Sequence, residues 1–241
     1  MANWVARSLL KGIRTTRWPA QPETTPGVTP GRPEPAWRED AERVASICPT
    51  AALKADALGV AVEFAGCVHC QRCRTGTEAL PWRADFEWAA GTDTAQAALP
   101  ARFRHALHVR YLDAGACGGC MGEARLIDAP PYNLHRFGIF ITATPRDADV
   151  LLIAGPVTEA MRVPLLRTYE AMPEPKRVVA MGVCAINGGV FGESFASAGG
   201  ASALVPVDVV IPGCPPPPLA IVHGLLLAVG RAKPAALEEA P

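Results

Sequence analysis

In the C-terminal part of the chain, short apolar runs alternate with helix-like segments in which apolar and polar positions are mixed. Five short runs rich in Val, Ile and Leu are bounded by Gly, Pro or Asp, and helix-like segments follow most of them; the runs are ALHVRYL, FGIFITA, DVLLIAG, RVVAMGV and VPVDVVI. Strands that alternate with helices in this way are typical of a parallel sheet covered on both faces. We therefore expect an α/β domain over residues 101–235.

A different pattern marks residues 1–40. Its apolar positions recur at roughly helical spacing with basic residues between them, namely Trp4, Val5, Leu9, Leu10 and Ile13 with Arg7, Lys11 and Arg14. This pattern predicts an amphipathic helix with a basic face. Such a helix could dock on a membrane, but we favour packing on a partner subunit or on its own domain, because it is short and weakly apolar. The Pro-, Gly- and Thr-rich stretch that follows predicts an extended strap or linker.

Length and charge narrow the classes of function. The 241 residues permit one core of ordinary size plus a smaller appendage. Because the formal net charge is zero, nucleic-acid binding is not expected. No stretch approaches the roughly 20 apolar residues of a membrane span, and the N-terminus lacks the apolar core and cleavage site of a secretory signal. We therefore expect a cytoplasmic protein whose attachment to a membrane would be peripheral.

The eight cysteines fall into two sets of four, Cys48, Cys67, Cys70 and Cys73, then Cys117, Cys120, Cys184 and Cys214. A disulfide framework is expected mainly in short secreted chains. In a reducing cytosol, thiols usually mean metal binding or catalysis, and zinc is an alternative for any CxxC pair. The context of both sets favours iron–sulfur ligation, so we expect an electron carrier.

The first set resembles two half-motifs of a bacterial ferredoxin. In those proteins the run C-x2-C-x2-C-x3-C-P gives three cysteines to one cluster and the cysteine before Pro to the other. Here CVHCQRC provides the three-ligand run, and Cys48 is an isolated Cys-Pro 19 residues upstream of Cys67, while the complementary halves are missing. By this crossover rule, the four cysteines are the ligands of one 4Fe-4S cluster in a ferredoxin-like α+β domain over residues 41–90.

The residues around this set carry weaker signals. The segment AALKADALGVAVEF predicts a short hairpin with its turn near Gly59. His69 is expected to face solvent, or to hydrogen-bond a cluster sulfur, and is given no ligand role because four thiolates already complete the site. Trp82, Phe86 and Trp88 are expected to cover the cluster or to pack against the next domain.

The second set follows the predicted strands. In open parallel sheets, ligands lie outside the carboxyl ends of the strands. Cys117 and Cys120 follow the first run, Cys184 ends the fourth and Cys214 follows the fifth, so we expect them to converge on one edge of the sheet. Their loops are glycine-rich, which lets backbone N–H groups approach a ligand. Hydrogen bonds from such groups to cluster sulfurs raise the reduction potential.

Four segments of the C-terminal part closely resemble the small subunit of NiFe hydrogenases and the 20 kDa subunit of respiratory complex I: DAGACGGCMGE, FGIFITATPRDADVLLIAGPVT, MPEPKRVVAMGVCAINGG and VPVDVVIPGCPP. The resemblance covers about residues 105–230. It implies a flavodoxin-like sheet that holds the 4Fe-4S cluster nearest the partner's reaction centre. By the same resemblance, the ligands of that cluster are Cys117, Cys120, Cys184 and Cys214.

One local feature separates the branches of this superfamily. Complex I subunits have two adjacent cluster cysteines, whereas Gly118 and Gly119 separate Cys117 from Cys120 here. This spacing, with Glu123 after it, resembles the membrane-associated, energy-converting hydrogenases, which include formate hydrogenlyase. The N-terminal portion resembles the polyferredoxin-like subunit of the same complexes. The chain thus resembles a fusion of two neighbouring subunits from which one ferredoxin cluster has been lost.

The resemblance implies an oxidoreductase subunit that is inactive alone. It would pass electrons through two 4Fe-4S clusters to or from a NiFe site in a hydrogenase-like large subunit, on the cytoplasmic face of the inner membrane. Membrane subunits and an electron-donor iron–sulfur protein or formate dehydrogenase would be further partners. The alternative is a peripheral-arm subunit of a complex I-like NADH/quinone oxidoreductase. A free-standing ferredoxin-like carrier or a zinc-stabilised binding module would need a self-sufficient chain.

Two charged residues are further candidates, and no catalytic residue is assigned to this chain. Arg146 could lie near the second cluster, where its charge would favour the reduced state; the alternative is a surface salt bridge with Asp147 or Asp149. Glu123 could relay protons towards the partner's site. For Glu123 we favour the alternative, a charge at the start of a helix stabilised by the helix dipole.

Overall fold

In the computed structural model, residues 3–76, 79–92, 103 and 105–235 are described. The larger part of this chain is built on a six-stranded sheet with the order β5-β12-β9-β8-β6-β7. Its strands are β6 (Leu107–Asp113), β7 (Ile139–Ile141), β8 (Val150–Ala154), β9 (Arg177–Met181) and β12 (Val209–Ile211), all parallel, and β5 (Ala90–Gly91), which pairs antiparallel with β12.

The order of the parallel strands identifies the architecture. Numbered along the chain, the five parallel strands lie in the order 2-1-3-4-5, which is the flavodoxin-like arrangement. Each of the five predicted apolar runs contains one of these strands. The predicted fold class, an α/β parallel sheet preceded by a small α+β domain, is confirmed, since short strands and helices precede the sheet; the ferredoxin likeness of that small domain stays a prediction.

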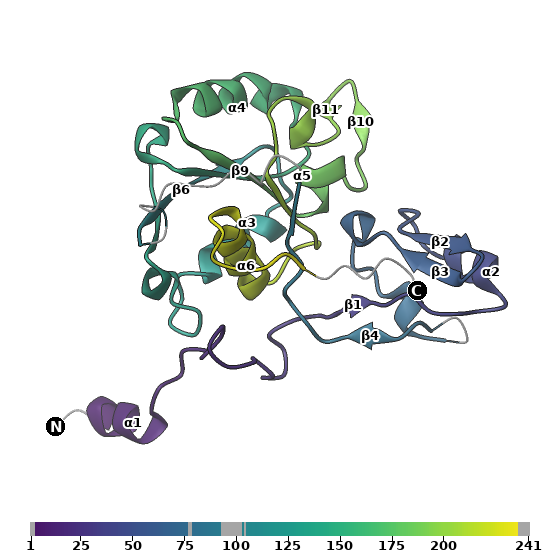
Figure 1. Ribbon diagram of the computed structural model, residues 1–241, viewed down its shortest axis with the longest axis horizontal. Coiled ribbons are helices and arrows are strands. Elements are labelled where there is room, and N and C mark those ends of the chain that lie inside the picture. Colours follow the sequence, from purple (N-terminus) through teal and green to yellow (C-terminus); the bar gives the residue numbers. More distant parts are fainter. Residues whose placement is uncertain (1–2, 77–78, 93–102, 104, 236–241) are drawn as a thin grey trace.

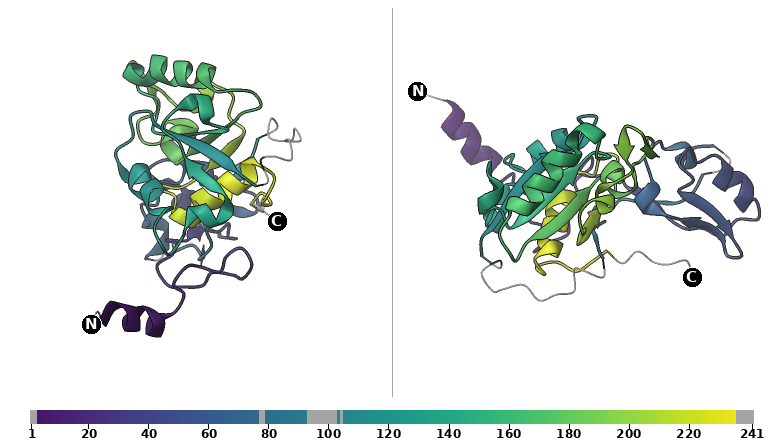
Figure 2. Two further views of the ribbon diagram at one scale, coloured as in Figure 1. Left: turned by 90° about the vertical axis from the view of Figure 1, so that its left-hand side faces the viewer. Right: turned by 90° about the horizontal axis from the view of Figure 1, so that it is seen from above.

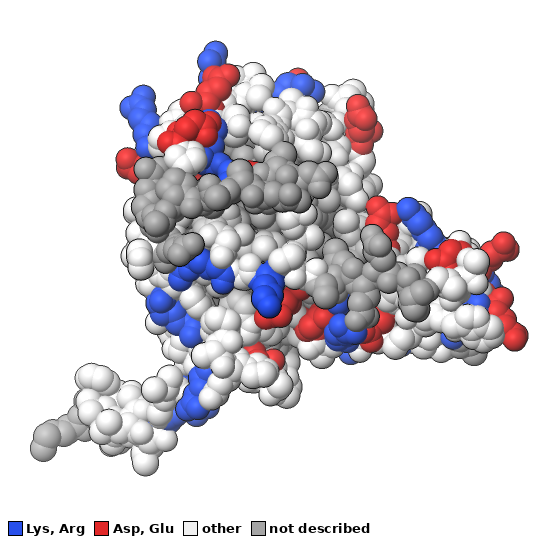
Figure 3. Space-filling model, in the orientation of Figure 1, with Lys and Arg blue, Asp and Glu red and all other residues white. Residues whose placement is uncertain are grey.

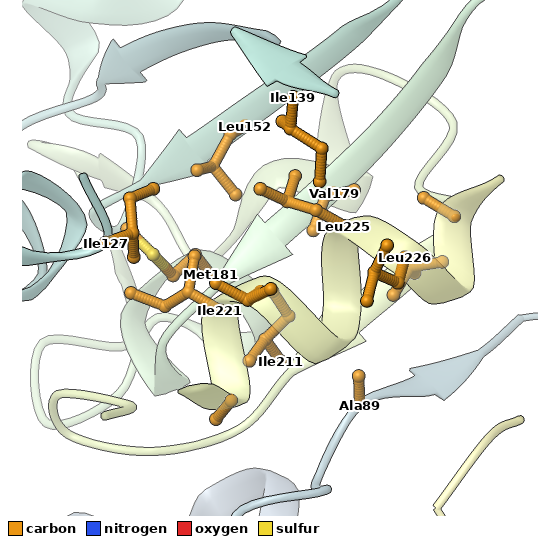
Figure 4. Packing of buried hydrophobic residues seen from close by; sticks show 14 of the residues in the cluster. Ala89, Ile127, Ile139, Leu152, Val179, Met181, Ile211, Ile221, Leu225 and Leu226 are labelled. Carbon is orange, nitrogen blue, oxygen red and sulfur yellow. The ribbon is translucent and has the colours of Figure 1, made fainter. Parts of the chain in front are cut away.

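Alternation along β8 shows how both faces of the sheet are buried. Leu152 belongs to the core cluster that includes α6 (Pro218–Ala228), whereas Leu151 belongs to the cluster that includes α4 (Glu159–Ala171). Figure 1 shows α3 (Gly119–Leu126) and α6 on one side of the sheet and α4 on the other. In Figure 4, side chains of α6 point towards those of the strands and close the first core. Strands covered on both faces are apolar throughout, as the sequence pattern indicated.

The small N-terminal region contains the predicted hairpin. β2 (Leu53–Asp56) pairs antiparallel with β3 (Gly59–Val62), and the Leu58 N–H donates to Asp56 Oδ1 at 2.8 Å in the turn. Gly59 has a φ of +118°, and a Cβ on it would lie 2.5 Å from the carbonyl oxygen of Ala36, so glycine is required there. The helix α2 (Ala41–Ser46) packs on the hairpin.

Short elements complete the two regions. They are the antiparallel pair β1 (Arg32–Pro33) and β4 (Trp82–Arg83), the antiparallel pair β10 (Glu193–Ser194) and β11 (Ser197–Ala198), the helix α5 (Val183–Asn187), and the 3-10 helices η1 (Phe64–Gly66), η2 (Arg72–Arg74), η5 (Leu134–Phe137), η6 (Pro145–Asp147) and η7 (Ala201–Ala203).

Two features join the N-terminal region to the large sheet. β5 follows β4 along the chain and forms the edge strand of the large sheet beside β12, so the segment that leaves the N-terminal region is hydrogen-bonded to that sheet. Trp18, from the Pro-rich strap, is 4% exposed and lies in the main core with Phe86 and Trp88. Its ring centroid is 5.5 Å from that of Phe86 and 6.1 Å from that of Phe137. Phe86 and Trp88 therefore pack against the α/β region, which is one of the two roles predicted for them.

The predicted N-terminal helix is present as α1 (Asn3–Lys11), and none of its residues is buried. It projects away from the rest of the molecule in each view (Figures 1 and 2). Among the described residues, no helix combines the length and the apolar character needed to cross a membrane. On the face shown in Figure 3, basic and acidic side chains are interspersed, in line with the zero net charge. The partner predicted for α1 stays a prediction.

Candidate metal centres

The first cysteine set surrounds one pocket in the N-terminal region. Cys48, Cys67, Cys70 and Cys73 all line it, and most of the other lining side chains are apolar, including Ile47, Leu53, Val62 and Trp82. Burial raises the pKa of Cys67 to about 11. A hydrogen bond from the backbone of His69 lowers this pKa, and the negative charges of the other three cysteines, when ionised, raise it further. The structure thus brings Cys48 to the CVHCQRC run, which the crossover rule requires.

The second set lies at the carboxyl edge of the large sheet. Cys117 precedes α3, Cys120 is in its first turn, Cys184 is in α5 directly after β9, and Cys214 follows β12. Burial raises the pKa of Cys120 to about 12, and the charges of Cys184, Cys214 and Cys117 raise it further. The strand-end convergence expected from the sequence is present, although ligation itself stays a prediction.

Two glycines leave room for the sulfurs of the second set. A Cβ on Gly182 would lie 2.6 Å from Cys120 Sγ, and a Cβ on Gly189 would lie 2.8 Å from Cys184 Sγ. Both residues have positive φ, +83° and +57°. Any side chain at either position would displace a cysteine sulfur, so these loops are shaped to hold the sulfurs close to the backbone.

Two of the buried side-chain donors that lack a hydrogen-bond partner in the described chain, Trp82 Nε1 and the Tyr111 hydroxyl, act electrostatically on or respond to a cysteine of each set. The indole of Trp82 is close enough to Cys73 to oppose the rise that burial causes in the pKa of that thiol, yet Trp82 Nε1 makes no hydrogen bond of normal geometry within the described chain. The Tyr111 hydroxyl is likewise buried without a partner among the described residues. Burial raises the pKa of Tyr111, and the negative charges of Asp113 and Cys120 raise it further. Buried donors of this kind are rare and call for an acceptor.

These features fit two 4Fe-4S clusters. All eight cysteines are free of disulfides. Four thiolates in one apolar pocket repel one another, and the irons of a cluster would supply the positive charge that relieves this. Cluster sulfurs would also be acceptors for Trp82 and Tyr111. Within the described residues, no three or more His, Cys, Asp or Glu side chains are placed to hold a single metal ion; a 4Fe-4S cluster makes a different demand, with one thiolate on each of four irons.

His69 lies between the two sets, and its position was not predicted. Its ring is half-buried and stacks on Trp88, with centroids 5.3 Å apart and planes 25° from parallel. Nε2 is 3.2 Å from the carbonyl oxygen of Gly31, and Nδ1 accepts the backbone N–H of Cys214 at 3.3 Å. Burial lowers the pKa of His69, although its bond to Gly31 acts in the opposite direction. The expectation that His69 faces solvent is therefore wrong, because its polar atoms are used inside the protein.

Glu123 and Arg146 have different surroundings from those expected. Glu123 is the fifth residue of α3 and lies beyond its first turn, so the helix-dipole interpretation of this residue is wrong. It lines a pocket of about 590 Å³ together with His69, Tyr132 and Cys214, and burial raises its pKa. A proton relay through Glu123 stays a prediction.

Arg146 is exposed in η6, which precedes the amino end of β8, whereas the second cysteine set lies at the carboxyl ends of the strands. The length of a strand thus separates Arg146 from the candidate site. Asp149, one of its expected partners, accepts the His108 backbone N–H at 2.9 Å and lies 3.5 Å from the His108 ring. The tuning role of Arg146 stays a prediction that this placement does not favour.

Comparisons with known proteins match the C-terminal region. The family model described as NADH ubiquinone oxidoreductase, 20 Kd subunit, matches residues 117–228, which include the second cysteine set and leave out the first. Formate hydrogenlyase subunit 7 of Escherichia coli is 41% identical over 135 residues, covering 56% of this chain and 53% of that protein. The chain thus spans about half the length of that relative.

Two further relatives represent both branches of the superfamily. The probable membrane-bound hydrogenase subunit mbhJ of Pyrococcus furiosus is 42% identical over 123 residues, covering 51% of this chain and 74% of that protein. A NADH-quinone oxidoreductase subunit of Citrifermentans bemidjiense is 51% identical over 108 residues, covering 44% of this chain and 62% of that protein. Both alignments leave a large part of this chain unmatched.

Proposed function

Because the chain belongs to the family of the NADH ubiquinone oxidoreductase 20 kDa subunit, we propose that it is an electron-transfer subunit of an energy-converting NiFe hydrogenase complex of formate hydrogenlyase type. In this proposal each set of four cysteines holds one 4Fe-4S cluster. The observation that carries the proposal is the convergence of all eight cysteines into two groups, each set among buried or apolar surroundings.

The residues of this chain would bind and insulate the two clusters. When bound, the clusters supply one-electron carriers. The thiolates hold the irons, and the glycine loops at Gly182 and Gly189 keep the sulfurs of the second set close to the backbone. The apolar lining of the first pocket excludes water, which favours the less charged state of a cluster. Trp82 and Tyr111 would each donate a hydrogen bond to a cluster sulfur.

The hydrogenase assignment rests on the spacing of Cys117 and Cys120, which two glycines separate. Since both sets use every cysteine of the chain, none is left over for a NiFe site. The NiFe site would therefore belong to a separate large subunit, and the chain alone would not turn over hydrogen. Membrane subunits, and an iron–sulfur donor or formate dehydrogenase, would complete a complex on the cytoplasmic face of the membrane.

Anaerobic purification of the complex by an affinity tag on this chain tests the proposal. We expect a co-purifying large subunit that contains nickel, and hydrogen-dependent dye reduction by the complex. The matched control is Cys184→Ser, which should retain the large subunit but lose dye reduction if electrons pass through the second cluster. A complex without nickel and without hydrogen-dependent dye reduction would refute the hydrogenase proposal.

The second candidate is a complex I-like NADH/quinone oxidoreductase subunit. The observation that favours it is the 51% identity to the NADH-quinone oxidoreductase relative from Citrifermentans bemidjiense. The same purified complex separates the two candidates, because this alternative requires a nickel-free large subunit and quinone reduction that does not depend on hydrogen. The two-cluster assignment is shared by both.

A further inference from the structure

A residue in the loop of the first cysteine set makes a hydrogen bond to a cysteine of the second set. His69 lies within CVHC, between Cys67 and Cys70 of the first set, and its Nδ1 accepts the backbone N–H of Cys214 from the second set at 3.3 Å. The bond joins residues 145 positions apart in the sequence. It therefore connects the ligand loop of one candidate cluster directly to a ligand residue of the other.

The hydrogen bonds also define the tautomer of the ring. An N–H group can only donate, so Nδ1 must be the bare nitrogen that accepts from Cys214. The proton then resides on Nε2, which donates to the carbonyl oxygen of Gly31 at 3.2 Å. The imidazole is thus neutral, with both nitrogens engaged.

Packing fixes the ring in this place. It stacks on Trp88, which is fully buried, and meets the edge of Phe64 with centroids 5.4 Å apart. Trp88 Nε1 in turn donates to Asp85 Oδ1 at 2.6 Å. His69 also has a φ of +51°, an uncommon conformation for a residue with a side chain. Such a conformation persists only where the surroundings determine it strongly, and it is typical of functional sites.

A second contact between the two regions is less direct. Asn187 Nδ2 donates to the carbonyl oxygen of Ala65 at 3.3 Å. Ala65 is two residues before Cys67, and Asn187 is three residues after Cys184. The covalent path from this bond to the cysteines is therefore longer at both ends than the path through His69.

We infer that His69 is a positioning residue that links the two clusters, so that its hydrogen bond to the Cys214 backbone N–H carries the electronic coupling between them. This inference rests on the proposed electron-transfer function. In each transfer one electron would leave a reduced cluster, which would be oxidised, and enter the other cluster, which would be reduced. His69 keeps its proton and its oxidation state, and no atom is exchanged.

Two substitutions separate the hydrogen bond from the packing. His69→Phe keeps an aromatic ring against Trp88 and Phe64 but removes both nitrogens. His69→Asn removes the ring but places Oδ1 where Nδ1 was, so it can still accept from Cys214, and Asn tolerates positive φ better than most residues. Asn187→Asp is the matched control, since it removes the Nδ2 donor to Ala65 and keeps the Oδ1 that accepts the Gly189 N–H at 3.0 Å.

The first readout is the bond itself, measured by hydrogen–deuterium exchange in the full chain. Cys214 is followed by Pro215 to Pro218 and preceded by Gly213 and Pro212, so a peptide over this segment carries few exchanging amides. We expect faster exchange of the Cys214 amide in His69→Phe and exchange at the wild-type rate in His69→Asn and Asn187→Asp. Wild-type exchange in His69→Phe would overturn the inference.

The second readout is the rate of electron transfer between the clusters after pulsed reduction of the full chain. Iron content and midpoint potentials are measured in each variant, so that rates are compared at equal driving force. We expect slower transfer in His69→Phe, and the wild-type rate in His69→Asn and in Asn187→Asp. Wild-type transfer in His69→Phe, or slow transfer in His69→Asn with both clusters present, would contradict the inference. A wild-type chain that binds fewer than two clusters would instead refute the proposed function, and the exchange experiment would still test the bond.

Discussion

At the scale of single residues, the second site depends on where side chains are missing. Gly182 combines φ of +83° with ψ of 154°, a region that is essentially restricted to glycine. The space where its Cβ would stand is occupied by Cys120 Sγ. This position therefore couples the backbone directly to the placement of one candidate ligand.

Gly182→Ala should impair the second cluster. Backbone strain in this region costs of order 1–3 kcal/mol, and the new methyl group must also push Cys120 Sγ from a contact of 2.6 Å. We expect loss of the second cluster's signal in electron paramagnetic resonance, with the first cluster unaffected. Gly122→Ala is the control, because nothing lies within 4 Å of the Cβ it would add. Equal cluster content in the two variants would show that the Gly182 contact is not needed.

The unpartnered donors of Trp82 and Tyr111 give a reciprocal pair of tests. Trp82→Phe removes the indole N–H beside Cys73, and Tyr111→Phe removes the buried hydroxyl near Cys120. Donors to cluster sulfurs raise the potential, so each substitution should lower the midpoint of its own cluster and leave the other unchanged. A neutral hydrogen bond contributes about 0.5–1.5 kcal/mol, which corresponds to roughly 20–60 mV for one electron. Redox titration that shows unchanged midpoints in both variants would exclude the two hydrogen bonds.

At the scale of elements, the N-terminal forty residues contain a helix without buried residues, followed by a strap that is attached to the core of the protein. No residue of α1 is buried, whereas Trp18 lies in the main core and its Nε1 donates to Glu87 Oε1 at 2.8 Å. The strap continues through Thr29, whose hydroxyl donates to the carbonyl oxygen of Asp85 at 2.6 Å. Composition alone predicts an extended segment here and does not reveal this anchor.

Removal of residues 1–11 and substitution of Trp18 should therefore have different effects. The truncated chain is expected to unfold at the wild-type temperature, because no residue of α1 is buried. Trp18→Ala should lower the free energy of unfolding by about 3–5 kcal/mol, the usual cost of deleting a buried large aromatic side chain. Thermal and denaturant unfolding measure both. A large loss of stability on truncation would mean that α1 packs against the domain after all.

Each element that the sequence predicted has a recognisable pattern of residue types within a few neighbouring positions. The five apolar runs and the hairpin turn at Gly59 can be recognised because burial on both faces and positive φ restrict residue type within a few positions. β5 could not be predicted, because Ala90 and Gly91 carry no strand signal and become a strand only by pairing with β12.

The candidate site also has features that local sequence patterns predicted and features that they could not. Spacing divided the eight cysteines into two sets, and the structure brings the members of each set together, while their role as ligands stays a prediction. It could not place His69, because the bond to Cys214 spans 145 residues, nor Trp82 and Tyr111, whose unpartnered donors are visible only in three dimensions. The sequence could not show how far Arg146 lies from the second set, because its helix η6 comes before the amino end of β8 while the cysteines lie at the carboxyl ends of the strands.

At the scale of the whole molecule, the two cysteine sets lie in one continuous structure. β5, which follows the N-terminal region along the chain, pairs with β12 at the edge of the large sheet. Trp88 is in the main core, and His69 stacks on Trp88 while it contacts Cys214. In the proposed function, an electron that enters at either cluster would reach the other without leaving the chain. This arrangement is what the fusion of a ferredoxin-like region to the 20 kDa-type region would achieve.

The central claim is that each set of four cysteines holds one 4Fe-4S cluster, and the Cys48→Ser variant tests it most directly. Cys48 is distant in sequence from CVHCQRC but lines the same pocket. In the anaerobically purified, dithionite-reduced wild-type chain we expect two 4Fe-4S signals and about eight irons. Cys48→Ser should abolish or alter the same paramagnetic signal as Cys70→Ser and leave intact the signal that Cys184→Ser removes. Two unaltered 4Fe-4S signals in Cys48→Ser, or zinc in place of iron in the wild-type chain, would contradict the account.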